Sequence, residues 1–189
     1  MPTSGKLLSS VLHDVAEKLG ARRKLTRYFK WTDSPVGSLN LIAGDIGLIA
    51  IVWRNDDPRR VRLTNLCESR EHPVLVEAER QLRDYFAGNR EAFDLKLDFV
   101  GTDFQKKVWN ALLAIPYGQT RSYAEIANSI GNSRAARAVG AANGKNPISI
   151  IAPCHRVIGS DGLLVAYAGG LAAKRYLLTL EGARTAVPL

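Results

Sequence analysis

The chain has 189 residues and a formal net charge of +8. This length suffices for one or two compact domains, and no apolar run approaches the roughly 20 residues of a membrane span, so a membrane protein is excluded. Its two cysteines form no CxxC motif and no cysteine–histidine cluster, so neither a disulfide framework nor a metal site is expected.

The N-terminal residues predict an amphipathic helix that serves only for packing. Its apolar residues recur at helical spacing, and Gly20 sits where a helix C-cap would. They are Leu8, Val11, Leu12, Val15 and Leu19. His13, Asp14, Glu17 and Lys18 follow soon after Leu12, which is not typical of a secretion signal. We therefore expect a cytoplasmic protein.

Three short apolar segments then predict an antiparallel sheet. They cover residues 28–31, 39–43 and 48–53, and turn-forming residues separate them. The polar and charged residues 55–62 predict a solvated loop after the third strand.

A second helix is predicted from Pro73, which suits a first helical turn, to Gly88, which suits a helix end. Its apolar positions share one face: Leu75, Ala78, Leu82, Tyr85 and Phe86. The alternation of Leu95, Leu97 and Phe99 predicts one more strand. No residue in this half suggests catalysis, so residues 1–95 are interpreted as a supporting α+β domain.

Two capping boxes mark helix starts in the second half, over residues 96–189. Thr102 with Gln105, and Ser122 with Glu125, have the spacing at which side chains satisfy the free backbone donors of a first turn. The first helix is expected to end at Pro116-Tyr117-Gly118 and the second at Gly131.

A third helix is predicted after Gly131-Asn132, with Ser133 as its N-cap. Its small apolar residues share one face, and Arg134 and Arg137 lie three apart on another. The small residues are Ala135, Ala138, Val139 and Ala142. Two helices joined by a tight turn form a helix-turn-helix.

This helix-turn-helix favours DNA binding in the minor groove over base reading in the major groove. The second helix is poor in side chains that read bases, and small residues allow a close approach to the sugar-phosphate backbone. The basic balance agrees with a nucleic-acid partner. A purely structural helical hairpin is the alternative.

Cys154 is the candidate nucleophile, because His155 and Arg156 follow it directly. A thiol reacts as the thiolate, and a neighbouring base or cation is expected to lower its pKa. The alternative is that Cys154 is a small buried hydrophobe at the end of a strand formed by the apolar residues 148–152.

The stretch Pro153-Cys154-His155-Arg156-Val157, followed by Ile158-Gly159 and Tyr167-Ala168-Gly169-Gly170, closely resembles the active-site region of the O6-alkylguanine-DNA alkyltransferases. The resemblance runs from about Thr102 to Gly182, whereas the N-terminal half matches only in general layout. It implies an N-terminal antiparallel sheet with helices, followed by a mostly helical C-terminal domain with a winged helix-turn-helix-like motif.

The resemblance also implies a reaction. The alkyl group of O6-alkylguanine in double-stranded DNA would pass irreversibly to Cys154 after the nucleotide is flipped, without a cofactor. The S-alkyl thioether cannot be hydrolysed like an acyl thioester, so one molecule would repair one lesion. A monomer is expected in solution, and activity on O4-alkylthymine and clustering along DNA stay open.

Catalytic and DNA-binding roles follow from the resemblance residue by residue. His155 and Glu181 match the pair that takes the thiol proton through a water, and Tyr123 matches the tyrosine that protonates purine N3 and lies against the 3′ phosphate. Arg137 matches the residue that fills the vacated space in the duplex, and Asn146 matches a support of the active-site turn. From the residues alone, Glu181 could be a surface charge and Tyr123 a packing residue.

The resemblance places the purine pocket around the main chain of Cys154, Val157 and Ala168. Residues 160–168 would cover it as a lid, with Tyr167 lining it. The family often has glycine at one or both of the positions held here by Val165 and Ala166. Side chains at both are expected to narrow the pocket, so that benzyl adducts react less well than methyl.

Two other functions fit parts of the pattern. A DNA-binding protein of this fold that performs no chemistry would need no cysteine, and the known non-reactive relatives have lost theirs. An unrelated cysteine hydrolase would need an oxyanion hole and repeated turnover, and the sequence offers no candidate for that hole.

Overall fold

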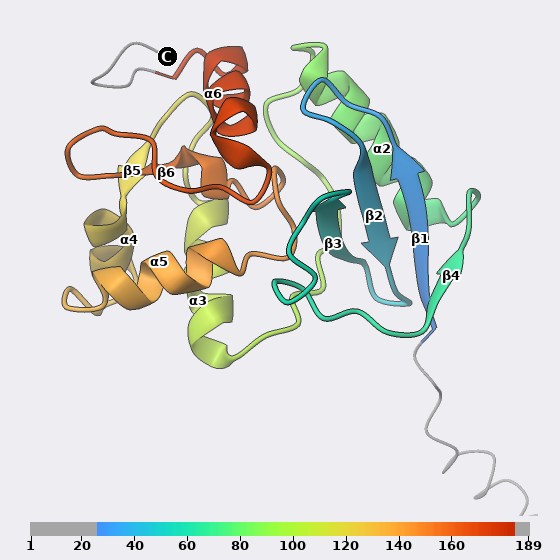
Figure 1. Ribbon diagram of the computed structural model, residues 1–189, viewed down its shortest axis with the longest axis horizontal. Coiled ribbons are helices and arrows are strands. Elements are labelled where there is room, and N and C mark those ends of the chain that lie inside the picture. The colour runs from blue at the N-terminus through green and yellow to red at the C-terminus, as the bar shows by residue number, and fades with distance from the viewer. Residues whose placement is uncertain (1–25, 184–189) are drawn as a thin grey trace, which may run out of the picture.

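The computed structural model describes residues 26–183. It consists of a sheet with one covering helix and a mostly helical half beside it (Figure 1). The α+β fold expected from the sequence is confirmed. The helix predicted over residues 8–19 lies outside the described residues.

The sheet has four strands in the order β3-β2-β1-β4. Strands β1 (Arg27–Thr32), β2 (Leu39–Ala43) and β3 (Leu48–Trp53) pair antiparallel, as predicted. The fourth strand, β4 (Leu66–Glu68), was not predicted and pairs parallel with β1, so the sheet is mixed rather than antiparallel throughout. All three of its residues are exposed, which leaves no alternation of buried and exposed positions to reveal it.

Helix α2 (Pro73–Phe86) covers this sheet with the face predicted for it. Leu75, Ala78, Leu82 and Tyr85 are buried in the core of the sheet half. Gly88 follows the helix with a φ of +74°, a conformation that glycine adopts readily.

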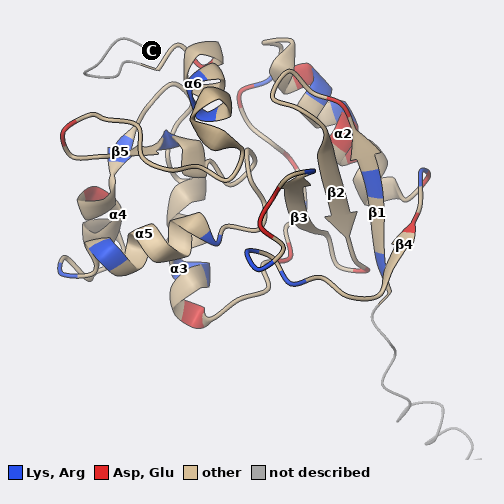
Figure 2. Ribbon diagram, viewed as in Figure 1, with Lys and Arg blue, Asp and Glu red and all other residues tan. Residues whose placement is uncertain are grey.

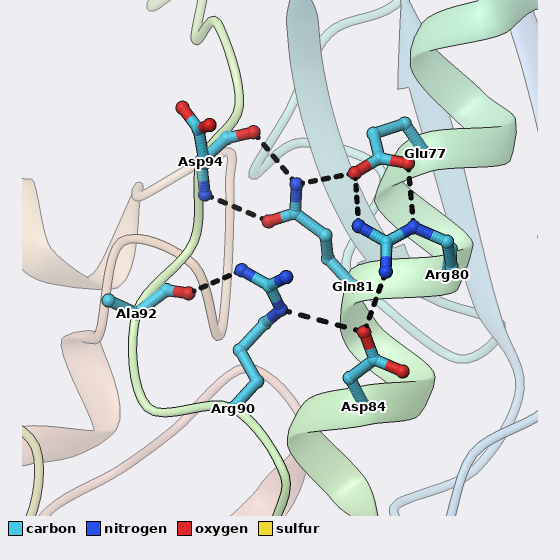
Figure 3. A network of polar contacts seen from close by, with 7 residues as sticks. All are labelled: Glu77, Arg80, Gln81, Asp84, Arg90, Ala92 and Asp94. Atoms are coloured by element: carbon cyan, nitrogen blue, oxygen red, sulfur yellow. Dashed lines mark hydrogen bonds and ion pairs between the residues drawn. The ribbon is translucent and has the colours of Figure 1, made fainter.

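Residues 95–99 do not form the predicted strand. They make one isolated β-bridge, between Leu97 and Leu48. Further along β3 another segment takes this edge, because Ile51 N donates to Pro147 O and Ile51 forms a β-bridge with Ile148. The preceding residues are fixed to α2 instead, where the Gln81 amide exchanges two 2.8 Å hydrogen bonds with the Asp94 main chain (Figure 3).

The helical half contains α3 (Asp103–Leu113), α4 (Tyr123–Ser129), α5 (Ala136–Gly144) and α6 (Gly170–Leu180). Both predicted capping boxes are present, at Thr102 and at Ser122. Two short parallel strands, β5 (Arg121–Ser122) and β6 (Val157–Ile158), join the start of α4 to the segment after the cysteine.

The predicted N-cap of α5 is wrong. Ser133 and Arg134 lie in the turn before the helix, and the N-cap is Ala135, whose side chain cannot cap. The turn is closed by main-chain bonds from Asn132 to Ala127 and from Ala135 to Asn132, which displace the helix start by two residues.

The two halves share one core. Ile148, Ile150 and Leu177 from the helical half pack with the sheet and α2. The division into two domains at residue 95 stays a prediction from the sequence. A second core lies between α3, α4 and α5 and includes Cys154. Within residues 26–183, no helix has both the length and the apolar character needed to cross a bilayer.

Candidate active site

The cysteine follows a tight turn, not the predicted strand. Residues 148–152 fold back through main-chain bonds from Ile151 to Ser149 and from Ala152 to Ile148, and Cys154 opens a short 3₁₀ helix, η1 (Cys154–Arg156). Ile150 is buried with a φ of +73°, which is strained for a β-branched residue and costs about 1–3 kcal/mol. Surrounding contacts must hold the turn in this form.

Asn146 provides part of that support. Its side-chain amide donates to Ala152 O at 2.7 Å, and its side-chain oxygen accepts from Ile148 N at 3.1 Å. The Arg60 guanidinium, itself paired with Asp56, donates to Asn146 O from the loop after β3. The predicted support position is therefore braced from both halves of the chain.

Cys154 is buried, with 4% of the residue exposed, and the pKa of its thiol is not lowered as its neighbours in sequence suggested. Burial raises the pKa of Cys154, and hydrogen bonding to Asn146 and the charges of Arg60 and Lys174 oppose that effect only in part. The free protein therefore holds a protonated thiol, and reaction requires a base that takes its proton.

His155 and Glu181 form a buried pair, with 2.9 Å between Nε2 and Oε1. Burial lowers the pKa of His155, and the contact with Glu181 opposes this, so the imidazole is neutral near neutral pH. Because an ionised carboxylate only accepts hydrogen bonds, Nε2 must carry the imidazole proton. Nδ1 is then an unprotonated base, and it has no hydrogen-bond partner within the described residues.

Glu181 is the C-cap residue of α6 and is 5% exposed, not a surface charge. Burial alone would raise the pKa of this carboxyl, but hydrogen bonds from His155 and Arg156 lower it to about 2. The Arg156 guanidinium binds both oxygens, Nε to Oε2 at 2.8 Å and Nη2 to Oε1 at 2.9 Å. The guanidinium is therefore engaged by the carboxylate of Glu181.

Two further donors to Glu181 were missed from the sequence. The Tyr85 hydroxyl, on α2, donates to Oε1 at 2.7 Å, and the Gly118 main chain donates to Oε2 at 3.4 Å. Gly118 has a φ of +70°, and a Cβ there would lie 2.8 Å from Glu181 O, so glycine is required. These partners lie 96 and 63 residues away in sequence, and no local pattern joins them.

Two tyrosines predicted for the site lie near the thiol. Tyr123, the first residue of α4, packs on the core that contains Cys154, and burial followed by the charge of Cys154 raises its pKa. Tyr167 makes edge contacts with the rings of His155 and Trp53, and burial followed by Cys154 raises its pKa. Both phenols are protonated at neutral pH and able to donate.

The predicted lid, residues 160–168, is attached to β6 through a buried lysine. Lys174 Nζ donates to Val157 O at 2.6 Å and to Val165 O at 3.1 Å, and burial lowers the pKa of Lys174 to about 8. The side chains of Val165 and Ala166 are exposed on the lid, whereas Ala168 is half-buried and packs on the core of the sheet half.

The DNA-facing residues predicted from the sequence are exposed together. Ser133 and Arg134 lie in the turn between α4 and α5, and Arg137 lies in the first turns of α5. Figure 2 shows basic residues on this turn and on α5, and α5 contains no acidic residue. Trp109 of α3 donates to Ala142 O at 2.9 Å and thereby holds α5 against the helical core.

Fold and site define a protein with a helix-turn-helix and a buried thiol next to a hydrogen-bonded histidine–glutamate pair. Two family models match it: the ribonuclease-like domain of 6-O-methylguanine DNA methyltransferase over residues 27–99, and the DNA-binding domain of 6-O-methylguanine DNA methyltransferase over residues 103–183. The chain belongs to the 6-O-methylguanine DNA methyltransferase family.

Relatives support the same family over most of the chain. A methylated-DNA–protein-cysteine methyltransferase of Methanosarcina acetivorans is 50% identical over 155 residues, which are 82% of this chain and 98% of the relative. One of Mycobacterium tuberculosis is 48% identical, over 86% of this chain and 96% of the relative. The crystal structure of M. tuberculosis OGT in complex with DNA superposes with a TM-score of 0.75 at 49% identity, over 82% of this chain and 92% of that one.

Proposed function

We propose that this protein repairs DNA by moving the alkyl group, chiefly methyl, from O6-alkylguanine in duplex DNA to its own Cys154. The observation that carries the proposal is a buried thiol beside the His155–Glu181 pair, within the half that bears the helix-turn-helix. The family assignment supports the same reaction. A cytoplasmic location belongs to this proposal, since the substrate is cellular DNA.

DNA is bound through α5 and the turn before it. Small residues on α5 allow a close approach to the minor groove, and Ser133 and Arg134 are placed to contact phosphates. Because Cys154 is buried, the damaged nucleotide must leave the stack to reach it, which costs a few kcal/mol. Arg137 fills the vacated space and offsets part of that cost.

The reaction is an in-line displacement at the alkyl carbon. A new bond forms between sulfur and carbon, and the bond between carbon and O6 breaks. The thiol proton passes through a water to Nδ1 of His155, and Glu181 stabilises the resulting imidazolium. Tyr123 protonates purine N3 so that guanine leaves neutral, and the imidazolium proton restores the phenol. The thiol proton has in effect moved to guanine.

Recognition of the purine falls to the main chain around Cys154, Val157 and Ala168, with Tyr167 beside it. The turn at 148–152, braced by Asn146, aims the sulfur. Lys174 Nζ donates both to Val157 O, in the proposed purine pocket, and to Val165 O, on the lid. One side chain therefore joins the lid to the pocket.

Intact-protein mass after incubation with a duplex containing O6-methylguanine tests the proposal. We expect one methyl group to be gained per molecule, located on Cys154, with an equal amount of guanine restored. No mass change would indicate a protein that only binds the lesion, and repeated demethylation without retained mass would indicate a hydrolase. Either of those outcomes would overturn the proposal.

Replacing Arg137 with alanine is expected to slow methyl transfer from duplex DNA by about 10- to 100-fold at saturating DNA, since base extrusion loses its compensation. Single-turnover rates on a methylated duplex measure this. The same variant should react with free O6-methylguanine base at the wild-type rate, because no extrusion is needed.

The matched control is Arg175→Ala, which removes an exposed arginine of α6 that lies outside the proposed DNA face. It should leave both rates unchanged. An equal loss for Arg137→Ala on duplex and on free base would contradict a role in extrusion.

A further inference from the structure

The hydroxyl of Tyr85 connects the sheet half to the proposed proton relay. Tyr85 lies on α2 and is fully buried, and its hydroxyl donates to Glu181 Oε1 at 2.7 Å. The same oxygen accepts from His155 Nε2 and from Arg156 Nη2, each at 2.9 Å. The N-terminal half, to which the sequence assigned only a supporting role, therefore places the Tyr85 hydroxyl against the Glu181 carboxylate of the proposed proton relay.

We propose that Tyr85 is a positioning residue for alkyl transfer, which holds Glu181 in place and sets how strongly its charge acts on His155. The inference rests on the proposed function. Tyr85 touches neither the thiol nor the substrate in this assignment, and it acts only through the carboxylate.

The packing of Tyr85 does not explain its hydroxyl. The ring lies 5.3 Å from the ring of Phe93, 5.4 Å from that of Phe86 and 6.3 Å from that of Tyr117, measured between centroids. Phenylalanine would fill the same apolar space without bringing a polar atom into the core. A buried hydroxyl is expensive unless it is hydrogen-bonded, and here its partner is an ionised carboxylate.

The direction of the effect follows from the number of donors. Tyr85, His155 and Arg156 all donate to Oε1, which has only two lone pairs to accept them, so each hydrogen bond weakens the others. Without the Tyr85 hydroxyl, more of the negative charge of Glu181 acts on His155, which favours the imidazolium and raises the pKa of His155. A larger fraction of the imidazole is then protonated at mildly acidic pH and unable to accept the thiol proton.

Other ionisable groups face the pair and act in both the wild type and the variant. Arg156 lies on η1, Lys174 on α6, Tyr117 before β5, Cys154 at the start of η1 and Tyr167 on the lid. The change from tyrosine to phenylalanine at residue 85 leaves each of these side chains in place, so a shift in the titration of His155 reports the lost hydroxyl.

The test is Tyr85→Phe in the full chain, with two readouts. The single-turnover rate of methyl transfer from duplex DNA is measured from about pH 5 to about pH 9, and the acid midpoint is expected to move up by roughly half a unit. In the free protein, NMR titration of the imidazole proton signals gives the pKa of His155 directly. Since the chain has 3 histidines, His13→Gln and His72→Gln assign the signals.

Tyr117→Phe is the matched control, because that hydroxyl donates to Leu180 O at 3.1 Å rather than to the carboxylate. It should leave the acid midpoint in place. In a Glu181→Gln background, Tyr85→Phe should produce no further shift in the His155 titration, since the charge it modulates is gone.

Two results would overturn the inference. One is a Tyr85→Phe protein whose rate falls equally at every pH, with an unshifted midpoint, as a general structural defect would give. The other is an unchanged His155 titration in the free protein. Failure of the proposed function looks different, because the wild type itself would then transfer no methyl group.

Discussion

Cys154→Ser is expected to reduce methyl transfer from O6-methylguanine by at least about 10⁴-fold, to the limit of detection. The serine hydroxyl ionises far less readily than a thiol, and the relay from His155 is too weak a base to remove its proton fully. Transfer of radiolabelled methyl from duplex DNA to protein measures the loss.

DNA binding separates this result from unfolding. Arg134 and Arg137 are exposed and are unchanged in this variant, so its affinity for methylated duplex should match that of the wild type. Cys67→Ser is the matched control, since Cys67 is the exposed second cysteine on β4, and it should retain full activity. Methyl transfer by the Cys154→Ser protein at a rate near that of the wild type would refute the assignment of the nucleophile.

Glu181→Gln is expected to slow methyl transfer by about 10²- to 10⁴-fold, the range in which general acid–base groups contribute. The amide carries no charge to stabilise the imidazolium of His155, and its NH₂ group would face the donors of Arg156. Loss of a buried ion-pair partner should also destabilise the fold by about 3–5 kcal/mol. Single-turnover kinetics and denaturant unfolding measure the two effects separately.

The pH dependence of stability gives the same carboxylate an independent signature. The pKa of Glu181 is lowered from its ordinary value of 4.5 to about 2, so its contribution is complete above pH 4.5 and disappears as the pH falls through 2. A shift of this size corresponds to about 3 kcal/mol. The wild type should lose this much more stability than Glu181→Gln between neutral pH and pH 2.

Glu77→Gln is a stringent control for that experiment. The pKa of Glu77 is also lowered to about 2, by hydrogen bonds from Arg80 and Gln81, but this group is open to solvent. Exposed pairs add little to stability, so Glu77→Gln should follow the wild type through the acid range. Equal behaviour of the two variants would contradict a special role for the buried carboxylate.

Local signals predicted the parts of the fold that local chemistry decides. The capping boxes at Thr102 and Ser122 and the apolar face of α2 each depend on residues a few positions apart, and all three were confirmed. Ser133 failed as an N-cap because main-chain bonds closed the turn two residues later, a competition that residue type does not reveal. The apolar run at 148–152 failed as a strand because Asn146 and Ile150 fold it into a turn.

The site was predictable only as far as the resemblance carried it. His155 and Glu181 are brought together as expected, 26 residues apart in sequence. The groups that surround the carboxylate could not be predicted, since Tyr85 lies on a helix of the other half and Arg156 binds a carboxylate 25 residues further along the chain. The thiol pKa was wrong in direction for the same reason, because burial is a property of the fold and not of neighbours in sequence.

The strained turn at Ile150 matters for a protein that uses its nucleophile only once, because it fixes the position of that nucleophile. The main-chain geometry of this turn is complete before DNA binds. The entropic cost of orienting the sulfur is therefore met when the chain folds and not during the reaction. Each molecule thus carries a preorganised attack geometry into its single encounter, and the entropy of alignment does not slow the repair event itself.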